Sequence, residues 1–521
     1  MSVLTYVDLF ERAARAAGNR TALIDETGAL SFAEVAALTS RFANALIASG
    51  FGPETRFAIL GPNTSLAMVA HIAGQRAGGA WANINLRNSL AGNIDILKRG
   101  GCEAVFFHSS CVHMIPEISA DVETLRFLVC VDKDVDGFPS METYSKDTYE
   151  TAGNVHLGPA QVGLLGSTGG TTGAAKITQS GQAFLSMSAL GFMLEMRFDR
   201  PPVNLAVAPI THAGGLVALA TLAMGGTVVM MATPDLDKLF ANIEQHRVSL
   251  LFLPPTLIYM LMSHPKCGST DFSSLRYLLS SAAPITTEKI IKAREIFGPV
   301  VCQCYAQTEC GMPLTFISPR EVSEAIADPK YAHRLKSAGR QTAIVGALEI
   351  MGDEGEILPS GQVGEIVIRG PMVMSAYVND PAATTEIKRF GWQHTGDVGY
   401  RDAEGYIYVT DRKRDLIITG GFNVFPLEVE DVLMSHAAVQ DCAVIGVADE
   451  KWGEAVKAVV QLAPGGQASE EELIWLCKEA LGSVKAPKSV DFIEQLPRSP
   501  VGKVLKRELR KQYAREKLPE A

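Results

Sequence analysis

Residues 166–176 combine small, flexible and hydroxylated side chains and end on a lysine. Glycines let backbone N–H groups approach a ligand closely and point the same way, which makes a concave anion site. Threonine hydroxyls add donors, and a lysine adds a charge suited to phosphate. The segment therefore predicts a clamp for nucleotide phosphates, with a plain Gly/Thr turn as the alternative; it is no Walker A loop, because no Gly-Lys-Ser/Thr closes it. The candidate binding residues are Thr168, Gly169, Gly170, Thr171, Thr172, Gly173 and Lys176.

The stretch from Thr168 to Lys176 is similar to the phosphate loop of the adenylate-forming enzymes, a superfamily of acyl-CoA synthetases, adenylation domains and luciferases. The usual form has Pro before the Lys and Gly after it, where this chain has Ala175 and Ile177. The donors of the loop are intact. The resemblance therefore implies that the loop orients the pyrophosphate part of ATP.

A second segment, residues 303–309, is similar to the family's Tyr-Gly-x-Thr-Glu pattern. By this resemblance Glu309 is the magnesium ligand, in keeping with the preference of Mg²⁺ for one or two carboxylates plus phosphate oxygens. Thr308 would donate to the α-phosphate. Ala306 stands where the family has Gly at the wall of the acyl pocket, so its methyl group is expected to narrow the pocket. Outside this context a Thr-Glu pair would more often be a helix start.

The resemblance also supplies contacts to the nucleoside. Residues 281–284 are similar to the family's loop beside the adenine, and residues 392–400 contain its Thr-Gly-Asp motif. Asp397 is assigned to the ribose hydroxyls, because a carboxylate accepts two hydroxyl protons well, and Arg412 is expected to reach them too. Alone, these segments would be a strand-to-helix turn and a hairpin turn. The predicted adenine-binding residues are Ser281, Ala282, Ala283, Gln303, Cys304 and Tyr305.

His212 follows Pro209 in a glycine-rich turn and matches the family position beside the acyl pocket. The alternative is an ordinary histidine at a strand end. Residues 204–232 contain no Asp or Glu, which argues against an amino acid substrate, since a buried ammonium needs a counter-charge. We therefore expect a carboxylic acid with an apolar tail: aromatic, alicyclic or medium-chain fatty.

The charged run 411–415 resembles the family's interdomain hinge, with Arg414 at the pivot. This places an adenylation domain at 1–411 and a mobile domain at 412–521. Residues 497–503 match the family's Pro-Arg-x-x-x-Gly-Lys, so Lys503, by itself an ordinary surface lysine, becomes the expected catalytic residue of the first step. Gly421 and Asn423 lie in the family's Gly-Gly-x-Asn motif and are assigned to coenzyme A.

Composition bounds the class of protein. The chain has 521 residues and a net charge of −10, which disfavours nucleic acid as a partner. The amino terminus has no basic region typical of a signal peptide, and no apolar run suggests a membrane span, so we expect a cytoplasmic enzyme. Nine cysteines without CxxC pairs predict reduced, structural thiols rather than a zinc site.

The elements that must position these residues have an α/β pattern. Helical spacing over 31–49, with Ser31 and Glu34 forming a capping box, alternates with buried strands such as 56–60 and 104–107. Such alternation predicts mostly parallel sheets. Residues 341–410 instead predict a small β-barrel or curved sheet, and the last hundred residues a small α+β domain. The expected fold is two α/β sheet subdomains and a small β-barrel, followed by the mobile domain.

Together the motifs resemble those of an acid–CoA ligase that uses ATP, Mg²⁺ and coenzyme A and forms an acyl adenylate. A stand-alone enzyme that loads a separate carrier protein is the alternative, and a nucleotide-binding regulator without turnover is a third class. The sequence leaves the oligomeric state open, with a homodimer as one option.

Overall fold

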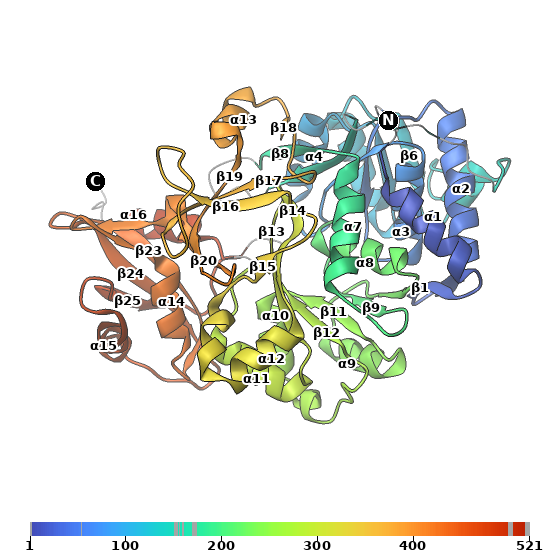
Figure 1. Cartoon of the computed structure of the whole chain (residues 1–521). Coiled ribbons are helices and arrows are strands. Elements are labelled where there is room, and N and C mark those ends of the chain that lie inside the picture. Colours follow the sequence, from blue (N-terminus) through green and yellow to red (C-terminus); the bar gives the residue numbers. More distant parts are fainter. Residues whose placement is uncertain are drawn as a thin grey trace.

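The computed structural model describes residues 3–53, 55–150, 155, 157–158, 161–168, 175–498 and 504–515. The described strands form four sheets, three in residues 21–412 and one in residues 417–492. In Figure 1 the last part of the chain lies at the left, beside the green and yellow segments that contribute α10 to α12.

The first sheet has the strand order β18-β8-β7-β4-β3-β5-β6. Its strands from β7 to β6 are parallel, and β8 and β18 are antiparallel additions at one edge. This confirms the mostly parallel sheet that the sequence predicts. The strands are β3 (Arg56–Leu60), β4 (Ala80–Ala82), β5 (Ala104–Phe107), β6 (Phe127–Cys130), β7 (Val162–Ser167), β8 (Ile177–Gly181) and β18 (Ala376–Tyr377).

The second sheet has the order β15-β14-β13-β12-β11-β9-β10-β1-β2 and is parallel from β13 to β1. The strands are β1 (Thr21–Asp25), β2 (Gly28–Ser31), β9 (Val203–Ala206), β10 (Thr227–Met230), β11 (Leu250–Leu253), β12 (Tyr277–Ser280), β13 (Val301–Gln307), β14 (Gly311–Ile317) and β15 (Arg340–Gln341).

Helices cover both sheets in layers. One apolar core joins the facing sides of the two sheets through α1, α2, α3, α7 and α8, while α4 and α5 cover the outer side of the first sheet and α9 to α12 that of the second. The helices are α1 (Tyr6–Ala17), α2 (Phe32–Ala48), α3 (Ser65–Arg76), α4 (Leu90–Gly100), α5 (Ile115–Asp121), α6 (Met141–Ser145), α7 (Ala183–Glu195), α8 (Ala213–Ala223), α9 (Leu236–Gln245), α10 (Pro255–Ser263), α11 (Thr287–Phe297), α12 (Pro319–Ala327) and α13 (Pro381–Ile387), with short 3₁₀ turns η1 (Ser109–Met114), η2 (Pro265–Gly268), η3 (Pro329–Lys336), η4 (Arg389–Gly391) and η5 (Lys413–Asp415).

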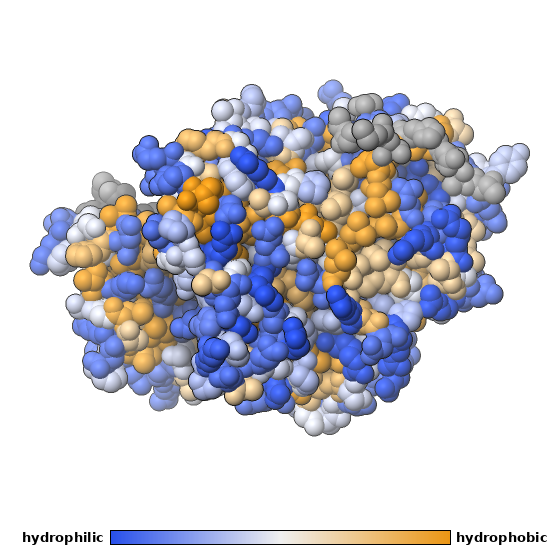
Figure 2. Space-filling model, in the orientation of Figure 1, coloured by the Kyte–Doolittle hydropathy of each residue, from blue (hydrophilic) through white to orange (hydrophobic). Residues whose placement is uncertain are grey.

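Local sequence explains two of these helices. The predicted capping box of α2 is present, because Ser31 accepts from the Glu34 amide and the Glu34 carboxylate accepts from Ser31. Helix α7 is apolar over most of its surface, and Phe184, Leu185 and Phe192 pack in the shared core. Leu194 at its end is 54% exposed, and Figure 2 shows an apolar band along this helix.

The third sheet is antiparallel, in the order β16-β17-β19-β20, and corresponds to the region expected as a small barrel or curved sheet. The β19–β20 hairpin carries Asp397 and Arg412 on neighbouring strands as register partners. The strands are β16 (Ala347–Met351), β17 (Gly364–Arg369), β19 (Gln393–Arg401) and β20 (Ile407–Arg412).

Residues 417–515, called here the C-terminal unit, have their own sheet and apolar clusters. The strand order is β22-β21-β24-β23, and β25 pairs in parallel with β24. This agrees with the predicted α+β unit. The elements are β21 (Ile417–Thr419), β22 (Phe422–Val424), α14 (Pro426–Met434), β23 (Val439–Asp449), β24 (Gly453–Leu462), α15 (Glu470–Leu481), β25 (Ser489–Phe492) and α16 (Lys506–Arg515).

The cysteine side chains lie in the interior of the protein. All nine cysteines are described, buried and unpaired, and burial raises the pKa of the Cys302 and Cys310 thiols well above the usual value. Inert structural thiols are the expected result. Among the described helices, none is both long and apolar enough to cross a bilayer.

Candidate active site

A cavity of about 720 Å³ opens where the carboxyl ends of β11, β12 and β13 meet the β19–β20 hairpin and the C-terminal unit. Carboxyl ends of parallel strands are where α/β sheets place their ligands. Of the residues predicted from sequence, the cavity wall contains Ser281, Ala282, Ala283, Gln303, Cys304, Tyr305, Ala306, Asp397, Arg412 and Arg414. The segments 281–306 and 397–414 therefore meet in one pocket.

The loop after β12 has an unusual backbone. Ala282 has φ +75°, in the left-handed region that side chains with a Cβ rarely adopt. The preceding Ser281 hydroxyl donates to the Cys304 carbonyl at 2.8 Å, which ties this loop to β13. The loop is thereby held in one shape against the cavity.

Asp397 is the polar centre of the cavity. Its side chain accepts hydrogen bonds from the Tyr305 hydroxyl and from Gln307 Nε2 at 2.5 Å, and it pairs with Arg412 Nε at 2.6 Å. Burial raises the pKa of Tyr305 well above its usual value, and the Asp397 charge raises it further, so the phenol stays a donor. Asp397 is 3% exposed, and its donors fix the carboxylate in one orientation.

Glu309 lies in a second cluster, beside the start of the phosphate loop. The Tyr377 hydroxyl donates to Glu309 Oε1 at 3.0 Å, and Lys176 Nζ lies 4.9 Å from the centre of the Tyr377 ring. A Cβ on Gly166 would lie 2.4 Å from Thr308 Cγ2, so glycine there lets Thr308 pack against the stem of the loop. The expected phosphate and metal residues are therefore brought together.

A magnesium ion fits this donor set. Within the described residues, no three His, Cys, Asp or Glu side chains form a ligand cluster. One carboxylate, Glu309, in the same cluster as Lys176 is the arrangement expected for an ion that takes most ligands from phosphate oxygens and water.

His212 caps the start of α8, and its ring nitrogen Nδ1 lies 3.3 Å from the Thr211 hydroxyl. Burial lowers the pKa of His212 to about 4, so the ring is neutral at neutral pH. It is not among the residues lining the cavity around Asp397. A neutral imidazole against the apolar core suits the wall of an acyl pocket.

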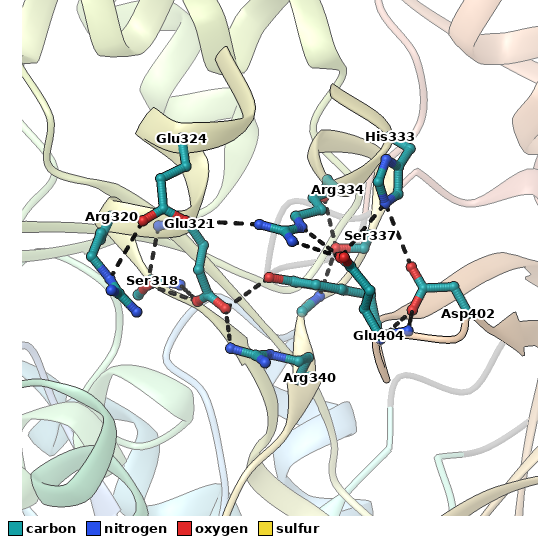
Figure 3. Close-up of polar contacts among 12 residues, drawn as sticks. Ser318, Arg320, Glu321, Glu324, His333, Arg334, Ser337, Arg340, Asp402 and Glu404 are labelled. Carbon is teal, nitrogen blue, oxygen red and sulfur yellow. Dashed lines mark hydrogen bonds and ion pairs between the residues drawn. The ribbon is translucent and has the colours of Figure 1, made fainter. Parts of the chain in front are cut away.

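One wall of the cavity, residues 335–338, is held by a polar network (Figure 3). The Arg334 side chain, 12% exposed, pairs with Glu404 Oε2 at 2.6 Å and lies over the rings of Tyr331 and Tyr406 at 3.9 and 5.1 Å. Glu404 belongs to the turn between β19 and β20. The network therefore connects the wall to the hairpin that carries Asp397.

The backbone of the wall depends on the same network. The Arg334 carbonyl accepts from the Ser337 amide and hydroxyl, and the Ala338 amide donates to the Ile407 carbonyl at 2.8 Å. Gly339 has φ +93°, and a Cβ there would lie 2.2 Å from the Phe316 carbonyl carbon, so only glycine fits.

We expect Arg334→Ala to raise the KM for ATP about fivefold, because the wall at 335–338 loses its anchor and the pocket loses its shape. The KM for the carboxylic acid should stay near the wild-type value. Steady-state kinetics with each substrate varied in turn measures both. The matched control is Arg320→Ala: Arg320 is 80% exposed and lies 3.8 Å from Glu324. A lower melting temperature with an unchanged KM for ATP would contradict the positioning role.

Some predicted residues lie elsewhere. Gly421 and Asn423 are on the exposed β21–β22 hairpin, next to Phe422, which is 60% exposed. Gly169, Gly170, Thr171, Thr172, Gly173 and Lys503 lie outside the described residues. Arg498 and Val504, which flank the segment containing Lys503, form a β-bridge and both line the cavity.

Sequence reasoning missed Gln307 and Tyr377. Gln307 lies two residues after Tyr305 in β13. Side chains two residues apart in a strand point to the same face, so this spacing was a signal for Gln307. Tyr377 offered none, because it reaches Glu309 through the pairing of β18 with β8, about 200 residues earlier in the chain, and through the bond from the Met374 amide to the Glu309 carbonyl.

Comparison with protein families matches residues 10–378 to the AMP-binding enzyme model and residues 428–503 to the AMP-binding enzyme C-terminal domain. The chain is 33% identical to the feruloyl-CoA synthase of an Amycolatopsis species over 504 residues, 96% of this chain and 98% of that protein. It is 32% identical to the indoleacetate–CoA ligase of Aromatoleum aromaticum over 496 residues, 94% of each. The structure of the amide bond synthetase McbA from Marinactinospora thermotolerans superposes with a TM-score of 0.88 and 28% identity, over 98% of this chain and 100% of that one.

Proposed function

The chain belongs to the AMP-binding enzyme family and is an ATP-dependent acid–CoA ligase, and from this premise we propose how its cavity performs the reaction. The enzyme converts an apolar carboxylic acid to its CoA thioester through an acyl adenylate and releases AMP and pyrophosphate. The observation that carries the site assignment is the Asp397 cluster with Tyr305, Gln307 and Arg412, set at the carboxyl edge of the second sheet.

In the first step a carboxylate oxygen of the acid attacks the α-phosphorus of ATP. The bond from that phosphorus to the bridging oxygen of the β-phosphate breaks, and pyrophosphate leaves. In the second step the thiol sulfur of coenzyme A attacks the acyl carbon, the bond from that carbon to the AMP oxygen breaks, and the thiol proton passes to solvent. Catalysis of the first step is mostly positioning and charge stabilisation, since no covalent bond to the protein forms.

The nucleotide would lie with its adenine against residues 281–283 and Tyr305 and its ribose hydroxyls on Asp397. Tyr305 and Gln307 donate to Asp397 Oδ2 and Arg412 pairs with Oδ1, so Oδ1 keeps one acceptor position for a ribose hydroxyl. Arg412 lies on the same side and would approach the ribose. These placements are supported by the shared cavity and by the fixed orientation of Asp397.

The phosphates would then extend toward Lys176, Thr308 and the loop 168–173. Glu309 would hold Mg²⁺ together with the phosphate oxygens, and when bound the ion neutralises charge on the transferring phosphate. Tyr377 orients the Glu309 carboxylate by its hydrogen bond. Lys503 would bring a positive charge to the α-phosphate, which gathers negative charge as the new bond forms.

For the second step we propose that residues 412–521 act as a mobile domain turning at Arg414, after an adenylation domain at 1–411. In the present orientation the Arg498–Val504 bridge lies at the cavity and the hairpin with Gly421 and Asn423 lies in solvent. This orientation supports the first step of the proposal. Rotation of the C-terminal unit would bring Gly421, whose lack of a side chain admits a narrow pantetheine arm, to the acyl adenylate.

The acid itself is apolar. Matched relatives are named for ferulate and indoleacetate, for medium- and long-chain fatty acids and for an alicyclic propanoate. An aromatic, alicyclic or medium-chain fatty acid therefore fits this chain. Ala306 lines the cavity and would set its width, and the neutral His212 would contribute to the acyl pocket without offering a counter-charge to an ammonium group.

The second candidate is transfer of the acyl group to a different acceptor, such as the phosphopantetheine arm of a separate carrier protein. The likeness to an amide bond synthetase supports this candidate. Such an enzyme passes its acyl group to an amine, which is an acceptor other than coenzyme A. Pyrophosphate release would be the same for both. Only the identity of the thioester product separates them.

The test is a pyrophosphate-release screen over aromatic, alicyclic and medium-chain fatty acids, with ATP, Mg²⁺ and coenzyme A present. We expect acid-dependent pyrophosphate release together with free acyl-CoA, identified by mass spectrometry. Pyrophosphate release with no acyl-CoA would favour the carrier-protein candidate. No acid-dependent release with any member of the panel would count against the proposed site.

A further inference from the structure

Helix α10 of the adenylation part lies between the cavity and the C-terminal unit. Its residues Pro255, Thr256 and Tyr259 line the cavity rim. The Tyr259 ring packs against the apolar cluster of the C-terminal unit, to which α14 contributes Val429 and Leu433. Tyr259 of the adenylation part therefore packs against the apolar core of the C-terminal unit.

A polar contact accompanies this packing. Arg498 Nη1 lies 3.4 Å from the Thr256 hydroxyl, while the same guanidinium pairs with Asp441 on β23. Arg498 forms a β-bridge with Val504, and the segment between them contains Lys503. Arg498, which directly precedes the segment containing Lys503, therefore contacts α10.

Charges across the boundary fit the same arrangement. Burial raises the pKa of Tyr259 above its usual range, and the carboxylates of Asp441 and Asp431 in the C-terminal unit raise it further. Burial raises the pKa of Asp431, and the positive charge of Lys336 in the adenylation part lowers it. Tyr259 therefore remains neutral at any working pH, as a packing contact requires.

Contacts between domains of one chain are generally small, so single residues at their centre carry much of the preference for one orientation. We propose that Tyr259 and Thr256 of α10 form a docking ledge, which holds the C-terminal unit in the orientation that places the Arg498–Val504 bridge at the cavity. The ledge acts on adenylate formation alone, because the second step uses another face of the unit. This inference rests on the proposed two-step function.

The experiment separates the half-reactions. In Tyr259→Ala we expect pyrophosphate release in a single turnover to slow about tenfold, the factor that corresponds to a loss of about 1.4 kcal/mol from the docked state. Thioester formation from synthetic acyl adenylate and coenzyme A should keep its wild-type rate or become faster. Tyr259→Phe should restore most of the adenylation rate, because the ring supplies the packing.

Met260→Ala is the matched control, since Met260 is the next residue of α10 and is 45% exposed. It should change neither half-reaction. Equal slowing of both half-reactions in Tyr259→Ala would overturn the ledge in favour of a general structural role, and so would an unchanged adenylation rate. The wild-type protein is assayed first, so that failure of the proposed function would appear as no adenylate at all and is distinguished from failure of the ledge.

Discussion

Replacing Lys503 by alanine should slow acyl-adenylate formation by at least about a hundredfold, the usual effect of removing one group that stabilises transition-state charge. Thioester formation from a synthetic acyl adenylate should stay within about twofold of wild type, because the α-phosphorus is not attacked in that step. The two rates are measured separately, by pyrophosphate release and by loss of free thiol.

The control for this variant is Lys511→Ala, which removes an exposed lysine of α16 that pairs only with Glu508 in the part of the chain that the structure describes. It should leave both rates unchanged. Adenylate formation at a near wild-type rate in Lys503→Ala would show that another group supplies the positive charge. A loss of both steps would point to misfolding of the C-terminal unit.

Asp397→Asn should lower kcat/KM for ATP about a hundredfold, within the range for losing a hydrogen bond to a charged group while leaving a partner unpaired. The amide NH₂ would face Arg412, itself a donor, in place of an oxygen at 2.6 Å. The KM for ATP should rise more than the KM for the acid, because Asp397 is assigned to the ribose.

Asp353→Asn is the matched control, because Asp353 is 87% exposed and pairs with Lys413 at the rim of the same sheet. It should have wild-type kinetics. If Asp397→Asn raised the KM values for ATP and acid equally, the carboxylate would be holding the cavity together and the ribose assignment would be wrong.

The sequence predicted the parts of the fold that local rules control. The capping box at Ser31 and Glu34 and the buried strands at 56–60 and 104–107 all follow from residue type and spacing. The family resemblance singled out Tyr305, Asp397 and Arg412, and the structure places all three at one cavity. Their contacts with the nucleoside stay a prediction.

The sequence offered no signal for contacts that depend on distant pairing. Tyr377 reaches Glu309 because a two-residue strand adds to β8, and Glu404 reaches Arg334 because a hairpin turn folds back on η3. Tyr259 looks like one more apolar residue of an amphipathic helix until the C-terminal unit is in place. In each case the partner lies 60 or more residues away, and composition near the residue says nothing about it.

The most direct test of the acyl-adenylate mechanism uses a carboxylic acid labelled with ¹⁸O in its carboxylate, chosen from the acids that support pyrophosphate release. Attack by the carboxylate on the α-phosphorus predicts that each AMP released during thioester formation carries one ¹⁸O atom, detectable by mass spectrometry. Unlabelled AMP, or label in orthophosphate formed together with ADP, would contradict the mechanism assigned to this cavity.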